Sequence, residues 1–196
     1  MLPDFQGFPK IPRLSREIIV SEKIDGTNAQ IFIFYEKTHG GDEQQCSPGD
    51  DCPMVLQMAV GSRTKWLTAG TDNHGFYKWA MLNKEQLLIL GPGRHFGEWW
   101  GSGIQRGYGL RKGEKRFSLF NTSVWNAETV PSCCSVVPVL YRGTFDTREI
   151  FATLLGLRIE GSVAAPGFMK PEGIIIYHIA ANQYFKKTID GDDIWK

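Results

Sequence analysis

The sequence of 196 residues suits one globular domain, because domains usually hold roughly 100–200 residues. Hydrophobic residues make up 42% and charged residues 22%, which are ordinary values for a globular chain. The formal net charge is only +1, which excludes nucleic-acid binding through bulk positive charge. The chain has no apolar stretch of the roughly 18 residues that span a membrane, and residues 1–16 lack the apolar core of a secretory signal. We therefore expect a cytoplasmic protein without a membrane partner.

The four cysteines agree with a reducing compartment. They are Cys46, Cys52, Cys133 and Cys134, and no two of them form a Cys-x-x-Cys pair. Their spacing matches no zinc ribbon or finger, and adjacent cysteines rarely form a disulfide because the geometry is strained. Free thiols are the main prediction, and a surface link between Cys46 and Cys52 is the alternative.

The first predicted elements are two strands, at residues 17–23 and 28–35. Apolar side chains fill both faces of the second strand, so we expect it to be buried on both sides. The Asp25-Gly26 pair between the strands indicates a tight turn. A polar loop or hairpin tip is expected at residues 39–53, which are rich in glycine and acidic residues.

Two helices are predicted farther along the chain. Residues 74–90 carry apolar side chains at helical spacing, and a Gly-Pro-Gly sequence from Gly91 would end that helix. Residues 146–155 form the second, with Asp146 as its N-cap and Gly156 at its end. The remaining predicted strands are 55–60, 94–100, 116–121, 135–141, 173–179 and 183–189. Many strands, few helices and no regular β-α-β alternation indicate an α+β fold with largely antiparallel sheets.

The densest chemical pattern is residues 21–28, which read Ser-Glu-Lys-Ile-Asp-Gly-Thr-Asn. Taken alone, this is typical of a β-turn with a surface lysine. Charged residues at other strand ends accompany it: Arg63, Glu98, Glu172, Lys186 and Lys187. A nucleophilic lysine needs nearby cations, both to favour its neutral form and to bind phosphates. A strand-end carboxylate suits a hard divalent cation.

Taken together, the lysine motif and the charged residues that follow it along the chain resemble, in type and order, the motifs of the covalent nucleotidyltransferase superfamily, which contains polynucleotide ligases and mRNA capping enzymes. Residues 23–28 look like its Lys-x-Asp-Gly nucleophile motif, and the Thr-Asn ending is more similar to ATP-dependent RNA ligases of the repair and editing type than to DNA ligases. The resemblance spans residues 21–188. It implies an α+β fold of antiparallel sheets flanked by helices and a single ATP-grasp-like nucleotidyltransferase domain of ligases over residues 1–196. Larger ligases carry a C-terminal OB-type or helical domain as well, and we expect no C-terminal OB domain here, because the sequence ends soon after the last motif.

The resemblance also implies a three-step reaction. Lys23 would attack the α-phosphorus of ATP, so that pyrophosphate leaves and a lysyl-N–AMP adduct forms, with Mg²⁺ or Mn²⁺ as the metal. The AMP would then pass to the 5′-phosphate of an RNA end. A 3′-hydroxyl would finally displace the AMP and seal the strand.

Individual roles follow from the same resemblance. The catalytic residues would be Lys23, Glu172, Lys186 and Lys187, with Glu172 also holding the metal through water. The nucleotide would be bound by Glu22 near the adenine, Asn28 near the α-phosphate or its attacking partner, Arg63 at the ribose and phosphate, Glu98 at a ribose hydroxyl and Phe120 stacked on the base. The family usually separates its last two lysines by one residue, whereas here they are adjacent. Because adjacent side chains of a strand point to opposite faces, we expect only one, Lys186, to reach the phosphate.

The expected partners are RNA ends with a 5′-phosphate and a 3′-hydroxyl, bound by a monomer. The sequence ends soon after the last lysines, so this domain or an accessory RNA-binding partner would supply the surface that binds the nick. A basic segment at residues 106–116 is either a solvated loop or a loop that tracks phosphates, with Tyr108 for stacking. Other functions stay open: a DNA nick ligase, a GTP-using capping-type nucleotidyltransferase, or a nucleotide-binding module without catalysis.

Overall fold

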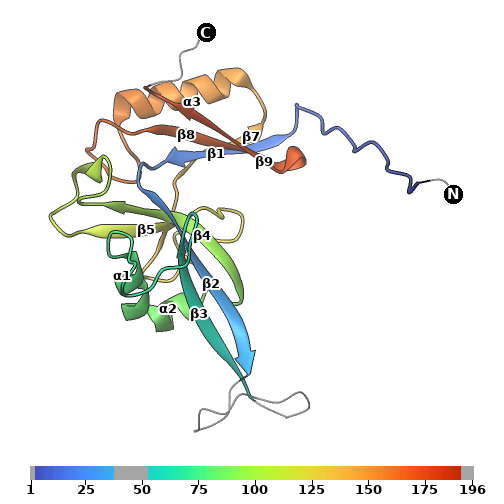
Figure 1. Ribbon diagram of the computed structural model, residues 1–196. Coiled ribbons are helices and arrows are strands. Elements are labelled where there is room, and N and C mark those ends of the chain that lie inside the picture. Colours follow the sequence, from blue (N-terminus) through green and yellow to red (C-terminus); the bar gives the residue numbers. More distant parts are fainter. Residues whose placement is uncertain (1–2, 38–52, 191–196) are drawn as a thin grey trace. The chain divides into compact units, whose positions relative to one another are not determined.

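The computed structural model describes residues 3–37 and 53–190. The chain forms two compact units, each with its own β-sheet (Figure 1). Unit 1 comprises Met1–Lys23 and Pro138–Lys196, and unit 2 comprises Ile24–Val137. The chain therefore passes from one unit to the other directly after Lys23, inside the lysine motif. A single nucleotidyltransferase domain over residues 1–196 stays a prediction.

Unit 1 is a four-stranded antiparallel sheet with one helix packed on it. The strands, in sheet order, are β7 (Val139–Thr144), β1 (Glu17–Lys23), β8 (Gly173–His178) and β9 (Gln183–Thr188). The 3₁₀ helix η2 (Ile179–Ala181) joins β8 to β9, and these two strands form an antiparallel hairpin. Helix α3 (Thr147–Glu160) buries Ile150 and Leu157 against the apolar side chains of β1 and β8.

Helix α3 begins where the sequence predicts and ends later. The Asp146 carboxylate accepts a hydrogen bond from the Arg148 amide at 2.8 Å, which confirms the N-cap. The predicted end at Gly156 is wrong, because the helix continues to Glu160 and is capped by Gly161, which has a φ of 86°. A glycine inside a helix costs about 1 kcal/mol relative to alanine. Burial of Leu157, one residue beyond Gly156, offsets that cost.

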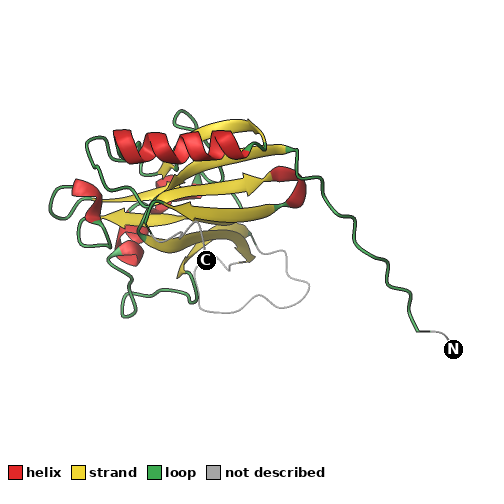
Figure 2. Ribbon diagram, turned by 90° about the horizontal axis from the view of Figure 1, so that it is seen from above, coloured by secondary structure: helices red, strands yellow, loops and turns green. Residues whose placement is uncertain are grey.

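Unit 2 is a five-stranded sheet with short helices. Its strands, in sheet order, are β3 (Met54–Ser62), β2 (Thr27–Lys37), β4 (Gly93–Gly101), β5 (Lys115–Leu119) and β6 (Ser135–Val136). All pairs are antiparallel except β5 with β6, so the sheet is mixed. The helices are α1 (Phe76–Leu82), α2 (Lys84–Leu88) and the 3₁₀ helix η1 (Gly107–Gly109). They are much shorter than α3 (Figure 2).

Strand β2 is buried on one face only, which corrects the prediction of burial on both. Ala29, Ile31 and Ile33 lie in the core of unit 2. Phe32 and Phe34, on the other face, are half-buried. The tight turn predicted at Asp25-Gly26 is a bend at Gly26, and it leads from the sheet of β1 into the sheet of β2.

Two further predictions need correction. The single helix at residues 74–90 is two helices, separated at Asn83, whose φ of −108° is not helical. The single strand at 135–141 is divided into β6 and β7, which lie in different sheets. Pro138 stands between them and lacks the N–H that a continuous ladder would need.

The remaining expectations concern cysteines and membranes. Cys133 and Cys134 are free thiols, as predicted, with their Sγ atoms 3.7 Å apart. Cys46, Cys52 and nearly all of the predicted polar loop lie outside the described residues. Within residues 3–37 and 53–190, no helix has both the length and the apolar character to cross a bilayer.

Candidate active site

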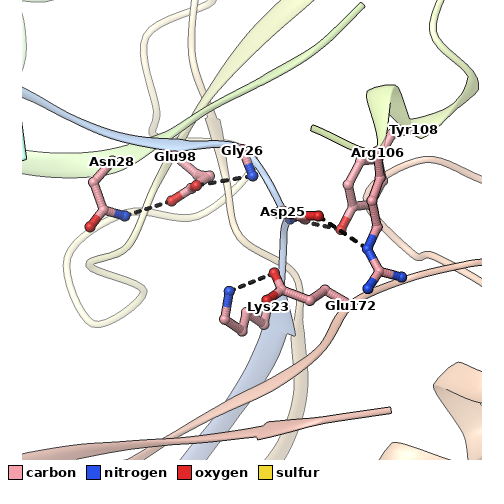
Figure 3. Close-up of polar contacts among 8 residues, drawn as sticks. All are labelled: Lys23, Asp25, Gly26, Asn28, Glu98, Arg106, Tyr108 and Glu172. Atoms are coloured by element: carbon pink, nitrogen blue, oxygen red, sulfur yellow. Dashed lines mark hydrogen bonds and ion pairs between the residues drawn. The ribbon is translucent and has the colours of Figure 1, made fainter. Parts of the chain in front are cut away.

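Lys23 lies at the end of β1, and its amine is paired with a carboxylate. Its Nζ donates to Oε2 of Glu172 at 2.5 Å (Figure 3). Glu172 directly precedes β8, and Gly173 of β8 is the cross-strand partner of Lys23. Strand pairing thus brings together two predicted catalytic residues that are 149 positions apart in the sequence. Both side chains are partly exposed, at 23% and 17%, so the pair is accessible to a ligand.

Gly173, which follows Glu172, is required by the close approach of β9. A Cβ at Gly173 would overlap the carbonyl oxygen of Lys187 and lie 2.7 Å from Cα of Thr188. Any side chain at this position would therefore push β9 away from β8. Because β9 carries Lys186 and Lys187, this glycine also fixes where those lysines lie.

The two adjacent lysines of β9 point to opposite faces of the unit 1 sheet. Lys187 pairs with Ile174, which is buried in the core beneath α3, and its Nζ lies 5.3 Å from the ring centroid of Phe151 of α3. Lys186 pairs with Ile175 and is exposed on the other face. Strand pairing puts Lys23 on that same face, because side chains two residues apart along a strand share a face. This geometry favours Lys186 as the lysine that acts with Lys23, and a phosphate contact by Lys186 stays a prediction.

Glu22 lies on the opposite face of β1 from Lys23 and is 1% exposed. Its carboxylate accepts hydrogen bonds from Ser162 Oγ at 2.6 Å and from the amides of Val163 and Ala164 at 2.9 and 2.8 Å. The side chain therefore fastens the loop after α3 to β1. The sequence held no signal for this loop, and a place for Glu22 near the adenine stays a prediction.

In unit 2, Glu98 of β4 holds the residues that follow the lysine. Its Oε1 accepts from the Gly26 amide at 3.1 Å, and its Oε2 accepts from Asn28 Nδ2 at 2.8 Å (Figure 3). A Cβ at Gly26 would lie 2.5 Å from the carbonyl oxygen of Trp99 and 2.7 Å from Cβ of Trp100. The glycine of the motif is therefore required by the close approach of β4, and the structure brings the predicted residues Asn28 and Glu98 together.

Asp25 is a functional candidate that the sequence reasoning treated only as a turn residue. Its amide donates to Tyr108 Oη at 2.8 Å, and its carboxylate accepts from Arg106 Nε at 3.1 Å (Figure 3). Tyr108 is buried with a φ of 51°, a conformation that costs energy for a side chain of this size. The place of Asp25 inside the lysine motif was the signal that could have identified it.

Several side chains of the basic segment at residues 106–116 form hydrogen bonds or ion pairs within unit 2. Besides the Arg106 pair with Asp25, Lys115 Nζ donates to the carbonyl oxygen of His74 at 2.6 Å. The carboxylate of Glu114 accepts from Arg116 at 2.6 Å, and this hydrogen bond lowers the pKa of Glu114. Phosphate tracking by this segment stays a prediction.

Arg63 and Phe120 are exposed residues of unit 2. Arg63 is in the turn after β3, which is closed by a hydrogen bond from the Ser62 amide to the carbonyl oxygen of Lys65 at 2.9 Å. Phe120 directly follows β5, and its amide donates to the carbonyl oxygen of Phe96 at 2.9 Å. In the described part of the chain, neither side chain bonds to another predicted site residue.

The carboxylate of Glu172 suits a metal ion that binds together with the phosphates of a nucleotide. Within the described ranges, no three His, Cys, Asp or Glu side chains are grouped as they would be for a resident ion. Mg²⁺ usually keeps several waters and is held by one or two carboxylates together with substrate phosphates. Glu172, which is partly exposed, fits the part of that single carboxylate.

Comparison with known proteins gives a family and a fold. The family model described as RNA ligase matches residues 16–189. No curated protein matches the chain. The similar solved structures include variants of the Naegleria gruberi RNA ligase. A lysine-to-alanine variant with ATP and manganese has 19% identity and a TM-score of 0.57, over 89% of this chain and 50% of that one.

Two further Naegleria ligase structures give similar values. A glutamate-to-alanine variant with ATP and manganese has 18% identity and a TM-score of 0.58, over 90% of this chain and 51% of that one. A lysine-to-methionine variant with AMP and manganese has 19% identity and a TM-score of 0.56, over 89% of this chain and 50% of that one. At this identity the likeness concerns the fold, and the chain spans about half the length of these ligases.

Proposed function

Because this chain belongs to the RNA ligase family, we propose that it is an ATP-dependent RNA ligase that joins a 5′-phosphate end to a 3′-hydroxyl end. The observation that carries this proposal is the lysine of the Lys-x-Asp-Gly motif, held at a strand end by Glu172 at 2.5 Å. The neutral form of this amine attacks phosphorus, and an adjacent general base such as the Glu172 carboxylate can take up its proton.

In the first step, Nζ of Lys23 attacks the α-phosphorus of ATP. A P–N bond forms, the bond to the β-phosphate oxygen breaks, and pyrophosphate leaves. The ammonium of Lys23 loses one proton before the attack, for which the carboxylate of Glu172 is within transfer distance, and the nitrogen releases a second proton to solvent as the P–N bond forms. In the second step, the 5′-phosphate of RNA takes the AMP and frees Lys23. In the third, a 3′-hydroxyl attacks that phosphate, AMP leaves, and a phosphodiester forms.

A divalent cation would be held by Glu172 through water, together with the phosphates of the nucleotide. Bound there, Mg²⁺ or Mn²⁺ would stabilise the negative charge that develops on the phosphate. The Naegleria ligase structures that contain ATP or AMP with manganese support this choice.

The nucleotide roles are proposed residue by residue. The carboxylate of Glu98, held by Gly26 and Asn28, is an acceptor for a ribose hydroxyl. The exposed guanidinium of Arg63 suits a phosphate, and the partly exposed ring of Phe120 suits a base.

The test follows the label from nucleotide to protein to RNA. The chain is incubated with Mg²⁺ and ATP labelled at the α-phosphorus, and protein-bound label is expected that acid releases. Adding RNA with a 5′-phosphate end and a 3′-hydroxyl end, either as single strands or as a nick, should transfer the label and then seal the strand. Label from GTP instead would favour a capping-type enzyme, and sealing confined to DNA nicks would favour a DNA ligase. ATP binding without any covalent label would overturn the proposal in favour of a binding module.

The opposite orientations of Lys186 and Lys187 predict unequal effects. Lys186→Ala should slow formation of the protein–AMP adduct by about 10–100-fold, because it removes a cation from the sheet face that bears Lys23. Lys187→Ala should slow it by less than about threefold, since that ammonium lies over Phe151 on the other face. Initial rates of label incorporation from ATP measure both. A larger loss from Lys187→Ala would contradict the assignment.

A further inference from the structure

One face of the unit 2 sheet carries aromatic side chains outside the core. Phe32 and Phe34 share this face of β2, with ring centroids 5.2 Å apart in a stacked arrangement. Trp66, which bridges to Gly61 of β3, stacks on Phe32 at 6.1 Å. Trp66 is 47% exposed, so part of a large indole faces solvent.

An arginine lies over these rings. Arg94 of β4 is the cross-strand partner of Phe32, and its guanidinium carbon lies 4.3 Å from the Phe32 centroid and 5.4 Å from the Trp66 centroid. Gln30 accepts a hydrogen bond from Arg94 at 3.1 Å, which helps to hold the guanidinium in place. Arg94 is exposed, so its positive charge is accessible to a ligand. We call Phe32, Phe34, Trp66 and Arg94 the aromatic–arginine platform.

The charges around the platform favour an anionic ligand. The only acidic residues of β2, β3 and β4 are Glu36 and Glu98, near opposite ends of this face. Arg63 and Lys65 are exposed in the turn that precedes Trp66. Exposed aromatic rings combined with cations are the features by which proteins hold single-stranded nucleic acid, because bases stack on the rings and phosphates meet the charges. Bases in a duplex are already stacked on each other, so the ligand must be unpaired.

The platform shares its sheet face with Asn28 and Glu98 of the candidate site. From Asn28 to Phe32 is four residues along β2, or about 13 Å at the rise of a strand. Stacked nucleotides rise about 3.4 Å each, so this span corresponds to about four nucleotides. We propose that the aromatic–arginine platform stacks unpaired bases of the RNA, about the third to fifth from the end being joined. This inference rests on the proposed ligase function and adds the surface that holds the RNA.

The test combines protein variants with RNA lacking bases. Filter binding measures the affinity of the whole chain for a single-stranded RNA of about a dozen nucleotides, and for the same RNA with abasic positions third to fifth from each end. Trp66→Ala should weaken binding to the first RNA at least about fivefold. It should have little further effect on the abasic RNA, because the stacking partner is already gone. Arg94→Lys, which keeps the charge but not the flat guanidinium, should show the same dependence on the bases.

Controls separate binding from folding. Lys78→Ala removes an exposed cation from α1, and Tyr35→Ala removes an exposed aromatic residue from the opposite face of β2. Both should bind RNA as the unmodified chain does, and thermal melting should show that Trp66→Ala is folded. The inference is overturned if the unmodified chain does not bind this RNA, if Trp66→Ala binds it equally well, or if the variant weakens intact and abasic RNA alike. Protein–AMP formation by the unmodified chain, measured in parallel, tests the ligase function separately.

Discussion

Lys23→Ala is expected to reduce protein–AMP formation at least roughly a thousandfold, because no other group can take over the bond to phosphorus. Lys23→Arg should be equally inactive. It keeps a positive charge opposite Glu172, but a guanidinium does not lose its proton in proteins and cannot act as the nucleophile. Label incorporation from ATP measures both variants. Lys10→Ala, at an exposed lysine of unit 1, is the matched control and should retain full labelling.

A second readout separates the nucleophile from a structural role. RNA that already carries AMP on its 5′-phosphate does not need the first two steps. Lys23→Ala should therefore still seal pre-adenylylated RNA to a 3′-hydroxyl, although it cannot start from ATP. Label on Lys23→Arg, or loss of both activities together with unfolding of Lys23→Ala, would contradict the assigned role.

The elements that the sequence predicted well are those set by local patterns. Strand β1 has the predicted bounds, Glu17–Lys23, because its apolar run ends in polar residues. The β8–β9 hairpin was predictable because Asn182 adopts the left-handed conformation that a short turn needs. Helix α3 extends beyond its predicted end because Leu157 is buried against the sheet. That contact cannot be recognised from the local sequence of the helix.

The candidate site was predictable by residue type and order but not by partner. Lys23 and Glu172 were identified separately, and only the pairing of β1 with β8 brings them together. The carboxylate of Glu98 was assigned to a ligand, yet it also holds Asn28. Arg106 looked like a surface cation because its bond to Asp25 joins positions 81 residues apart. Such long-range contacts depend on the fold and leave no local trace in the sequence.

The buried carboxylate of Glu22 gives the largest expected change in stability. Glu22→Ala should lower the free energy of unfolding by about 4 kcal/mol, since it leaves the buried hydroxyl of Ser162 and the partly buried amide groups of Val163 and Ala164 without their acceptor. It also opens a cavity beside β1. Urea unfolding followed by far-UV circular dichroism suits the measurement, because α3, the longest of the described helices, belongs to the same unit.

Glu22→Gln is the matched control, because it keeps the shape and changes only the charge and one acceptor. Its amide oxygen can accept from Val163 and Ala164, and its amide nitrogen can donate to Ser162 Oγ. The charge-assisted bonds become neutral ones, which are roughly half as strong, so the loss should be about 1–2 kcal/mol. Equal losses from the two variants would mean that the negative charge of Glu22, rather than the presence of a hydrogen-bonding group there, decides the stability. A loss below about 1 kcal/mol from Glu22→Ala would mean that the loop does not depend on Glu22. Because Glu22 and Lys23 are neighbours on opposite faces of β1, the carboxylate that fixes the loop also fixes the strand end that carries Lys23.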